Sequence, residues 1–113
     1  MEIEILEILD KSDLAHERVV FKVNEDCNCW PFILFRNKGV RSESRPYIFN
    51  NIDVEKGDVI TLYTKKGDNR KDRLGNGMTN HILYWGLNIS IWDCKDCIAL
   101  LVKTDKFEFK KIK

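Results

Sequence analysis

Four cysteines in two closely spaced pairs are the residues of this chain whose types and spacing could support metal or redox chemistry. One residue separates Cys27 from Cys29, and two residues separate Cys94 from Cys97. If both pairs lie in turns at one end of a β domain, four thiolates form a tetrahedral zinc site, although only the second pair has the favoured spacer. A cysteine without such partners is commonly a buried free thiol. We therefore expect free structural thiols and no cofactor, with a zinc site on the four cysteines or disulfides as the alternatives.

The segment 92–97, WDCKDC, also has the cysteine spacing of a thioredoxin-type redox site. That chemistry needs the first sulfur at a helix N-terminus, where the dipole lowers the pKa of the thiol. Here the run IALLV follows and predicts a strand, and Asp93 and Asp96 disfavour a thiolate. We do not expect this pair to catalyse redox chemistry.

The two histidines, His16 and His81, are the remaining candidates for catalysis. No local motif pairs either one with a cysteine nucleophile. Gly75-Asn76-Gly77 predicts a turn rather than a phosphate-binding loop, and the carboxylates lie among lysines as on a solvated surface. We expect that the protein is not an enzyme; an undetected hydrolase would need a pocket that holds a histidine beside a cysteine or a carboxylate.

Basic residues gather in the segment 65–73 and at the C-terminus. The first group is Lys65, Lys66, Arg70, Lys71 and Arg73; near the C-terminus, Phe107 and Phe109 alternate with lysines. Such a patch with aromatic side chains is typical of nucleic-acid contacts, in which lysines follow phosphates and rings stack on bases. Lysines on a terminal strand also prevent edge-to-edge pairing, with the phenylalanines turned inward. We favour this second interpretation and keep nucleic-acid binding as an alternative.

Length and charge predict a single domain over residues 1–113. The chain has a net charge of +1, so its overall charge gives no support to nucleic-acid or membrane-surface binding. The N-terminal segment is acidic where an export signal needs basic residues, and no apolar run approaches the roughly 18 residues of a membrane helix. We expect a cytoplasmic protein without membrane contacts.

Short apolar segments separated by turn residues predict an all-β fold, a sandwich of about eight or nine strands. The expected strands are 2–9, 19–23, 30–35, 47–49, 59–64, 81–85, 88–92, 98–102 and 106–110. Lys65–Asn80 reads as one long surface loop, and long loops in compact domains are often functional.

Along nearly its whole length this pattern resembles the lamin-tail domain, an immunoglobulin-like β-sandwich. The matching pieces are Glu17-Arg18-Val19-Val20, a strand running into Asn24, Tyr47-Ile48-Phe49, the segment VEKGDVITLY with Gly57, and Trp92 followed by Asp96, Ala99 and Leu100. The turn Asp93-Cys94-Lys95-Asp96 departs from the family, which has asparagines and a glycine there. The segment Thr104-Asp105-Lys106 also lacks the family's glycine, and the region around Trp30 lacks the usual Gly-Trp pair.

The resemblance implies structural roles for these positions and a non-catalytic function. Trp92 would lie between two sheets with its indole N–H bonded to an acceptor, Gly57 would adopt a positive φ, and Asp96 would cap its turn. Domains of this family act as interaction modules. We therefore expect a protein-binding or scaffolding module that uses the Lys65–Asn80 loop or an exposed edge strand. The alternatives are a nucleic-acid contact through residues 65–73 and a small β domain stabilised by zinc.

Overall fold

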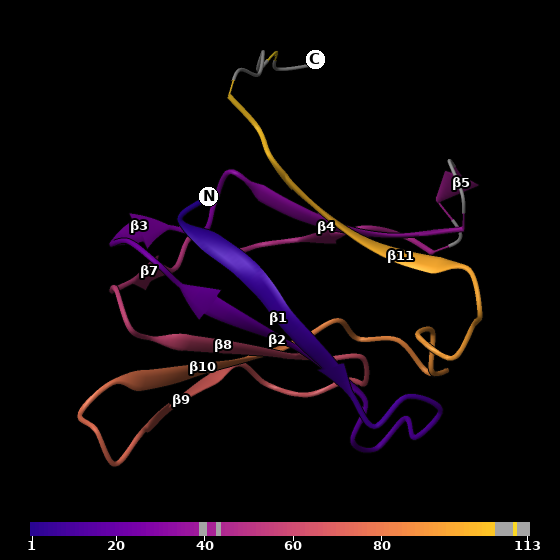
Figure 1. Ribbon diagram of the computed structural model, residues 1–113, viewed down its shortest axis with the longest axis horizontal. Coiled ribbons are helices and arrows are strands. Elements are labelled where there is room, and N and C mark those ends of the chain that lie inside the picture. Colours follow the sequence, from indigo (N-terminus) through magenta and orange to yellow (C-terminus); the bar gives the residue numbers. More distant parts are fainter. Residues whose placement is uncertain (39–40, 43, 106–109, 111–113) are drawn as a thin grey trace.

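A computed structural model describes residues 1–38, 41–42, 44–105 and 110 of the chain (Figure 1). These residues contain eleven β-strand segments and no helix. The larger sheet has the strand order β1-β2-β8-β10-β9. Its strands are β1 (Ile3–Leu9), β2 (Arg18–Val23), β8 (Val59–Tyr63), β9 (Arg70–Arg73) and β10 (Thr79–Tyr84). In β2, Val19, Phe21 and Val23 are buried and Lys22 is exposed, the alternation of a strand with one face on a core.

A second sheet lies over the first and gives the fold its sandwich-like form (Figure 1). Its central strand β4 (Phe32–Lys38) pairs with β11 (Cys97–Lys103) on one side and with β5 (Arg41–Ser42) and β6 (Tyr47–Ile48) on the other. A separate two-stranded sheet joins β3 (Cys27–Asn28) to β7 (Asp53–Val54).

Aromatic side chains from both sheets fill the core between them. The rings of Phe21 and Phe49 meet edge to face with centroids 5.5 Å apart, and the rings of Trp85 and Trp92 are 6.2 Å apart. Trp92 is 3% exposed, which confirms its expected place in the core. The expected acceptor for its indole is absent, because Nε1 of Trp92 is buried without a hydrogen-bond partner among the described residues.

The larger sheet contains one parallel pair, β8 with β10, and β9 lies outside β10. After β8 the chain moves to the edge of the sheet, forms β9, turns at residues 74–78 and returns as β10 between its two neighbours. The edge position of β9 follows from this path. The prediction of one long loop over Lys65–Asn80 is therefore wrong, because the segment contains β9 and the start of β10.

Four further predictions fail or lie outside the described residues. Residues 88–92 form no strand, and β4 begins at Phe32, which leaves Trp30 in a turn with 56% of its surface exposed. Of the strand predicted over 106–110, residues 106–109 lie outside the described part. The described residues form eleven strand segments rather than eight or nine because β3, β5, β6 and β7 are two residues each.

The turn before β8 has the predicted backbone. Gly57 has a φ of 94°, a conformation that favours glycine, and a Cβ there would also lie 2.7 Å from Sδ of Met78. Its N–H donates to the carbonyl of Val23, which ties the turn to the end of β2. No helix among the described residues is long and apolar enough to cross a membrane.

Candidate functional site

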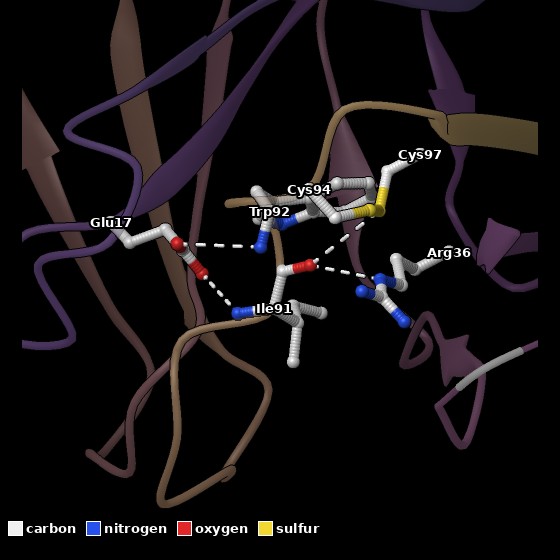
Figure 2. The surroundings of a disulfide bond; sticks show 6 residues. All are labelled: Glu17, Arg36, Ile91, Trp92, Cys94 and Cys97. Atoms are coloured by element: carbon white, nitrogen blue, oxygen red, sulfur yellow. Dashed lines mark hydrogen bonds between the residues drawn. A yellow bond between two sulfur atoms is a disulfide. The ribbon is translucent and has the colours of Figure 1, made fainter. Parts of the chain in front are cut away.

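The structure separates the two cysteine pairs. Cys94 and Cys97 form a disulfide at the start of β11, whereas Cys27 and Cys29 are free thiols in and beside β3, at the other end of the molecule (Figures 1 and 2). The expectation of free thiols is therefore wrong for the second pair. The described residues contain no group of three or more histidines, cysteines or carboxylates placed to hold a metal ion.

The free thiols are poorly suited to chemistry. Burial, together with smaller effects of nearby Cys27 and Asp53, raises the pKa of Cys29 to about 12. Burial also raises the pKa of Cys27, with the charge of Glu2 as the next cause. Because the thiolate is the reactive form, both cysteines are expected to be inert near neutral pH.

A buried carboxylate, Glu17, fixes the irregular segment between β10 and β11. Its side chain is fully buried and accepts hydrogen bonds from Thr64 Oγ1 at 2.7 Å and from Ile91 N at 2.9 Å. A longer bond of 3.4 Å comes from Trp92 N, and the carbonyl of Ile91 accepts a bond from Arg36 Nε (Figure 2). The segment that lacks strand pairing is thus held by the side chains of Glu17 and Arg36. This role is structural, because every donor is a group of the fold itself.

Of the predicted binding residues, Arg70, Lys71 and Arg73 lie on β9, an edge strand whose four residues are all exposed. Strand alternation places Lys71 and Arg73 on one face and Arg70 with Asp72 on the other. Arg70 Nε lies 3.7 Å from Asp72 Oδ1. Neither Lys71 nor Arg73 belongs to an ion pair among the described residues. The basic residues therefore form two separate surfaces rather than one patch.

On the outer face of β8 and β10, two tyrosines organise the rest of the basic segment. The rings of Tyr63 and Tyr84 stack with centroids 5.5 Å apart, and Lys65 Nζ lies 5.1 Å from the centroid of Tyr63. Arg70 donates to the hydroxyl of Tyr84 at 2.6 Å. Gly67 packs so closely that an added Cβ would lie 2.4 Å from Cε1 of Tyr84. These contacts occupy the tyrosines and leave Lys66 as an exposed lysine nearby.

Beside the other face of β9 are two neighbouring hollows of about 210 and 400 Å³, both lined by Lys71 and His81. The smaller hollow is also lined by Asn50, Asn69 and Arg70, and the larger one by Asp53, Glu55 and Arg73 among others. The surface next to β9 therefore carries fixed charges of both signs. Amide side chains add neutral hydrogen-bonding groups.

His81 and Asp58 form a buried pair at the bottom of this surface. His81 Nε2 lies 2.9 Å from Asp58 Oδ2, and the two side chains are each 5% exposed. Burial raises the pKa of Asp58, but hydrogen bonds from the N–H groups of Glu55 and Thr79 and from His81 outweigh it, and the pKa falls below its ordinary value. The carboxylate therefore joins the turn before β8 to the start of β10. His81 Nδ1 is buried and has no partner among the described residues.

A third hollow of about 550 Å³ lies next to β3. Its wall includes exposed Trp30 with Pro31 and Cys27, and the ion pair of Glu2 with Lys103 borders it. Sequence reasoning placed Trp30 in a buried strand and missed this surface. Most of the exposed wall is apolar.

Comparisons with known proteins do not assign the chain to a family. No family model, no curated protein and no solved structure matches the chain.

Proposed function

We propose that this chain is a non-catalytic interaction module that binds an acidic segment of a protein partner along β9. The observation that carries the proposal is an open sheet edge with two cations beside two hollows. These cations, Lys71 and Arg73, belong to no ion pair among the described residues, although Arg73 donates to the carbonyl of Gly77. Exposed strand edges are common sites for binding extended peptides. Carboxylates on such a peptide would complement the two cations.

We further propose an immunoglobulin-like topology and kinship with lamin-tail domains. The support comes from three positions of the resemblance: Trp92 and Tyr47 are buried in the core, and Gly57 has a positive φ directly before β8. A non-catalytic role is supported by the environment of His81, whose Nε2 bonds a carboxylate that also braces two backbone N–H groups. Fold similarity alone does not define a partner, so the surface at β9 carries the functional argument.

Nucleic-acid binding is the second candidate, and the contacts around β9 weigh against it. A strand that alternates its cations between two faces offers no continuous track for a phosphate backbone. The tyrosine rings that would stack on bases already contact Lys65, Gly67 and each other. We therefore favour a protein partner.

The proposal is tested by charge reversal on β9. Poly-glutamate and a single-stranded DNA oligonucleotide are titrated into the protein at low and at physiological salt. Lys71→Glu combined with Arg73→Glu should weaken poly-glutamate binding about tenfold or more, because each exposed pair contributes roughly 0.2–1 kcal/mol and reversal replaces attraction by repulsion. Lys11→Glu combined with Lys38→Glu changes the net charge equally at exposed sites away from β9 and should leave binding within about twofold.

Two results would contradict the proposal. Equal loss of binding in both double variants would mean that only net charge matters. Tighter binding of DNA than of poly-glutamate, with log affinity falling linearly with log salt, would instead identify a nucleic-acid module.

A further inference from the structure

The backbone of β9 has unpaired hydrogen-bonding groups at two defined residues. In an antiparallel pair, opposite residues alternate between those that bond each other and those whose N–H and C=O point away. The bond from Leu74 N to Met78 O, 2.7 Å long, marks a bonded pair at the turn of the hairpin. With Arg73 opposite Thr79, Asp72 opposite Asn80 and Lys71 opposite His81, the bonded residue of these three on β9 is Asp72. The N–H and C=O groups of Lys71 and Arg73 therefore point out of the sheet.

These two residues also line the hollows beside β9. Lys71 lines both hollows and Arg73 lines the larger one. No backbone hydrogen bond outside the ladder involves either residue within the described part of the chain. Free pairing groups and unpaired cations thus coincide at the same two positions of the edge.

We propose that β9 binds its partner by strand addition, with an antiparallel segment that carries acidic residues opposite Lys71 and Arg73. This inference rests on the proposed function and specifies its binding mode. Antiparallel addition lets each of these residues exchange two hydrogen bonds with the residue directly opposite, about 5.5 Å away between Cα atoms. The partner residue between the two acids lies opposite Asp72, on the other face of the sheet. A basic residue there would complement the charge of Asp72. The partner motif is acid–base–acid.

An edge strand made of Arg, Lys, Asp and Arg has a competing explanation, since charge on a short edge prevents unwanted pairing. Strand addition and prevention of unwanted pairing both predict that apolar or cationic segments do not bind β9. They differ for a segment of complementary charge, because cross-strand pairs of opposite charge stabilise a sheet. Binding of a peptide with the acid–base–acid pattern therefore distinguishes strand addition from protection of the edge.

The test uses the peptide acetyl-Ser-Thr-Glu-Lys-Glu-Thr-Ser-amide, titrated into the isotope-labelled intact protein and followed by NMR at low salt. N-methylation removes one N–H and blocks approach on that side. A methyl group on the first glutamate should weaken binding about tenfold, because that N–H would donate to β9. The same modification on the central lysine is the matched control and should change affinity less than about twofold, because its N–H points away from β9.

A second pair of peptides tests the alternation of charge. Exchanging the order from Glu-Lys-Glu to Glu-Glu-Lys keeps the composition but leaves one acid on the face of Lys71 and Arg73. Binding should weaken roughly two- to fivefold, the effect of one exposed cross-strand pair.

The outcomes separate this inference from the proposed function. Strand addition is overturned if both methylated peptides bind like the parent peptide, if only methylation of the lysine weakens binding, or if the parent peptide fails to bind where poly-glutamate binds. In these cases loss of poly-glutamate binding in the Lys71→Glu, Arg73→Glu variant still upholds the acidic-partner proposal. If that double variant binds poly-glutamate and the peptide as well as the parent protein does, both proposals are overturned.

Discussion

Removing the carboxylate of Glu17 should destabilise the domain more than any exposed substitution. The side chain is fully buried and accepts bonds from Thr64 Oγ1, Ile91 N and Trp92 N (Figure 2). Glu17→Ala leaves these donors without an acceptor in the interior. The segment that follows β10 would lose the side chain that holds it against the larger sheet.

The magnitude follows from the number of donors. A buried donor left unsatisfied costs about 1–3 kcal/mol, and the weakest of these three bonds, at 3.4 Å, contributes least. We expect a loss of about 3–6 kcal/mol from the free energy of unfolding, a large part of the roughly 5–15 kcal/mol of a typical domain. Glu17→Gln keeps one carbonyl oxygen but points an amide N–H₂ at a donor, so it should lose about half as much.

The assay is urea unfolding followed by tryptophan fluorescence, since Trp85 and Trp92 lie in the core. Glu4→Ala is the matched control, because Glu4 is exposed and lies 3.9 Å from Lys22; its loss should stay below about 0.5 kcal/mol. A loss below about 1 kcal/mol for Glu17→Ala would refute the account, because the buried donors would then have other acceptors.

Three further predictions concern stability and reactivity. Gly67→Ala places a methyl group 2.4 Å from a stacked tyrosine ring and should cost about 1–3 kcal/mol in thermal unfolding, whereas Gly75→Ala, with no atom within 4 Å, should be neutral or slightly stabilising. Since hydrogen bonds lower the pKa of Asp58 below its ordinary value of 3.8, its contribution to stability is present above that pH and is lost as the pH falls through the folded-state pKa. The difference in urea midpoint between the parent and Asp58→Asn should therefore be constant above about pH 5 and shrink below about pH 3; a difference independent of pH would contradict this. Iodoacetamide should leave Cys29 unmodified in the native protein and label it after unfolding, with partly exposed Cys27 as the internal comparison by mass spectrometry; early labelling of Cys29 would contradict its burial.

The strands that sequence alone could predict are those with an alternating or a continuous β-branched apolar pattern. The alternation of Val19, Phe21 and Val23 predicted β2, and the β-branched segment after Gly57 predicted β8. In both cases the local pattern and the tertiary environment agree. The all-β class followed from the repetition of this pattern.

β9 was missed because Arg-Lys-Asp-Arg carries neither strand propensity nor an apolar face. Its strand conformation comes from pairing with β10, which only the folded chain provides. Trp30 was misplaced for the opposite reason: an apolar run predicts burial, but Pro31 and the turn before β4 leave the ring exposed. Tertiary context overrides the local signal in both segments.

The candidate site was partly predictable. The sequence identified Lys71 and Arg73 as basic residues of a possible binding surface, but it could not assign them to one face, because that requires the register of β9. The pairing of His81 with Asp58 joins a residue of β10 to one in the turn before β8 and leaves no local signal. Glu17 likewise had no signal beyond its place in the segment that resembles the lamin-tail domain, since three of its four donors lie 47 to 75 residues away along the chain and the fourth is the nearby N–H of Ser12.

Hydrogen exchange of the β9 amides, with and without poly-glutamate, tests most directly whether the open edge is the binding surface. In the free protein, the amides of Lys71 and Arg73 should exchange rapidly, while that of Asp72, bonded to β10, should be protected. Added poly-glutamate should slow exchange at Lys71 and Arg73 and leave the far edge strand β1 unchanged. Protection of Lys71 and Arg73 in the free protein, or rapid exchange at both in the presence of saturating poly-glutamate, would contradict the account.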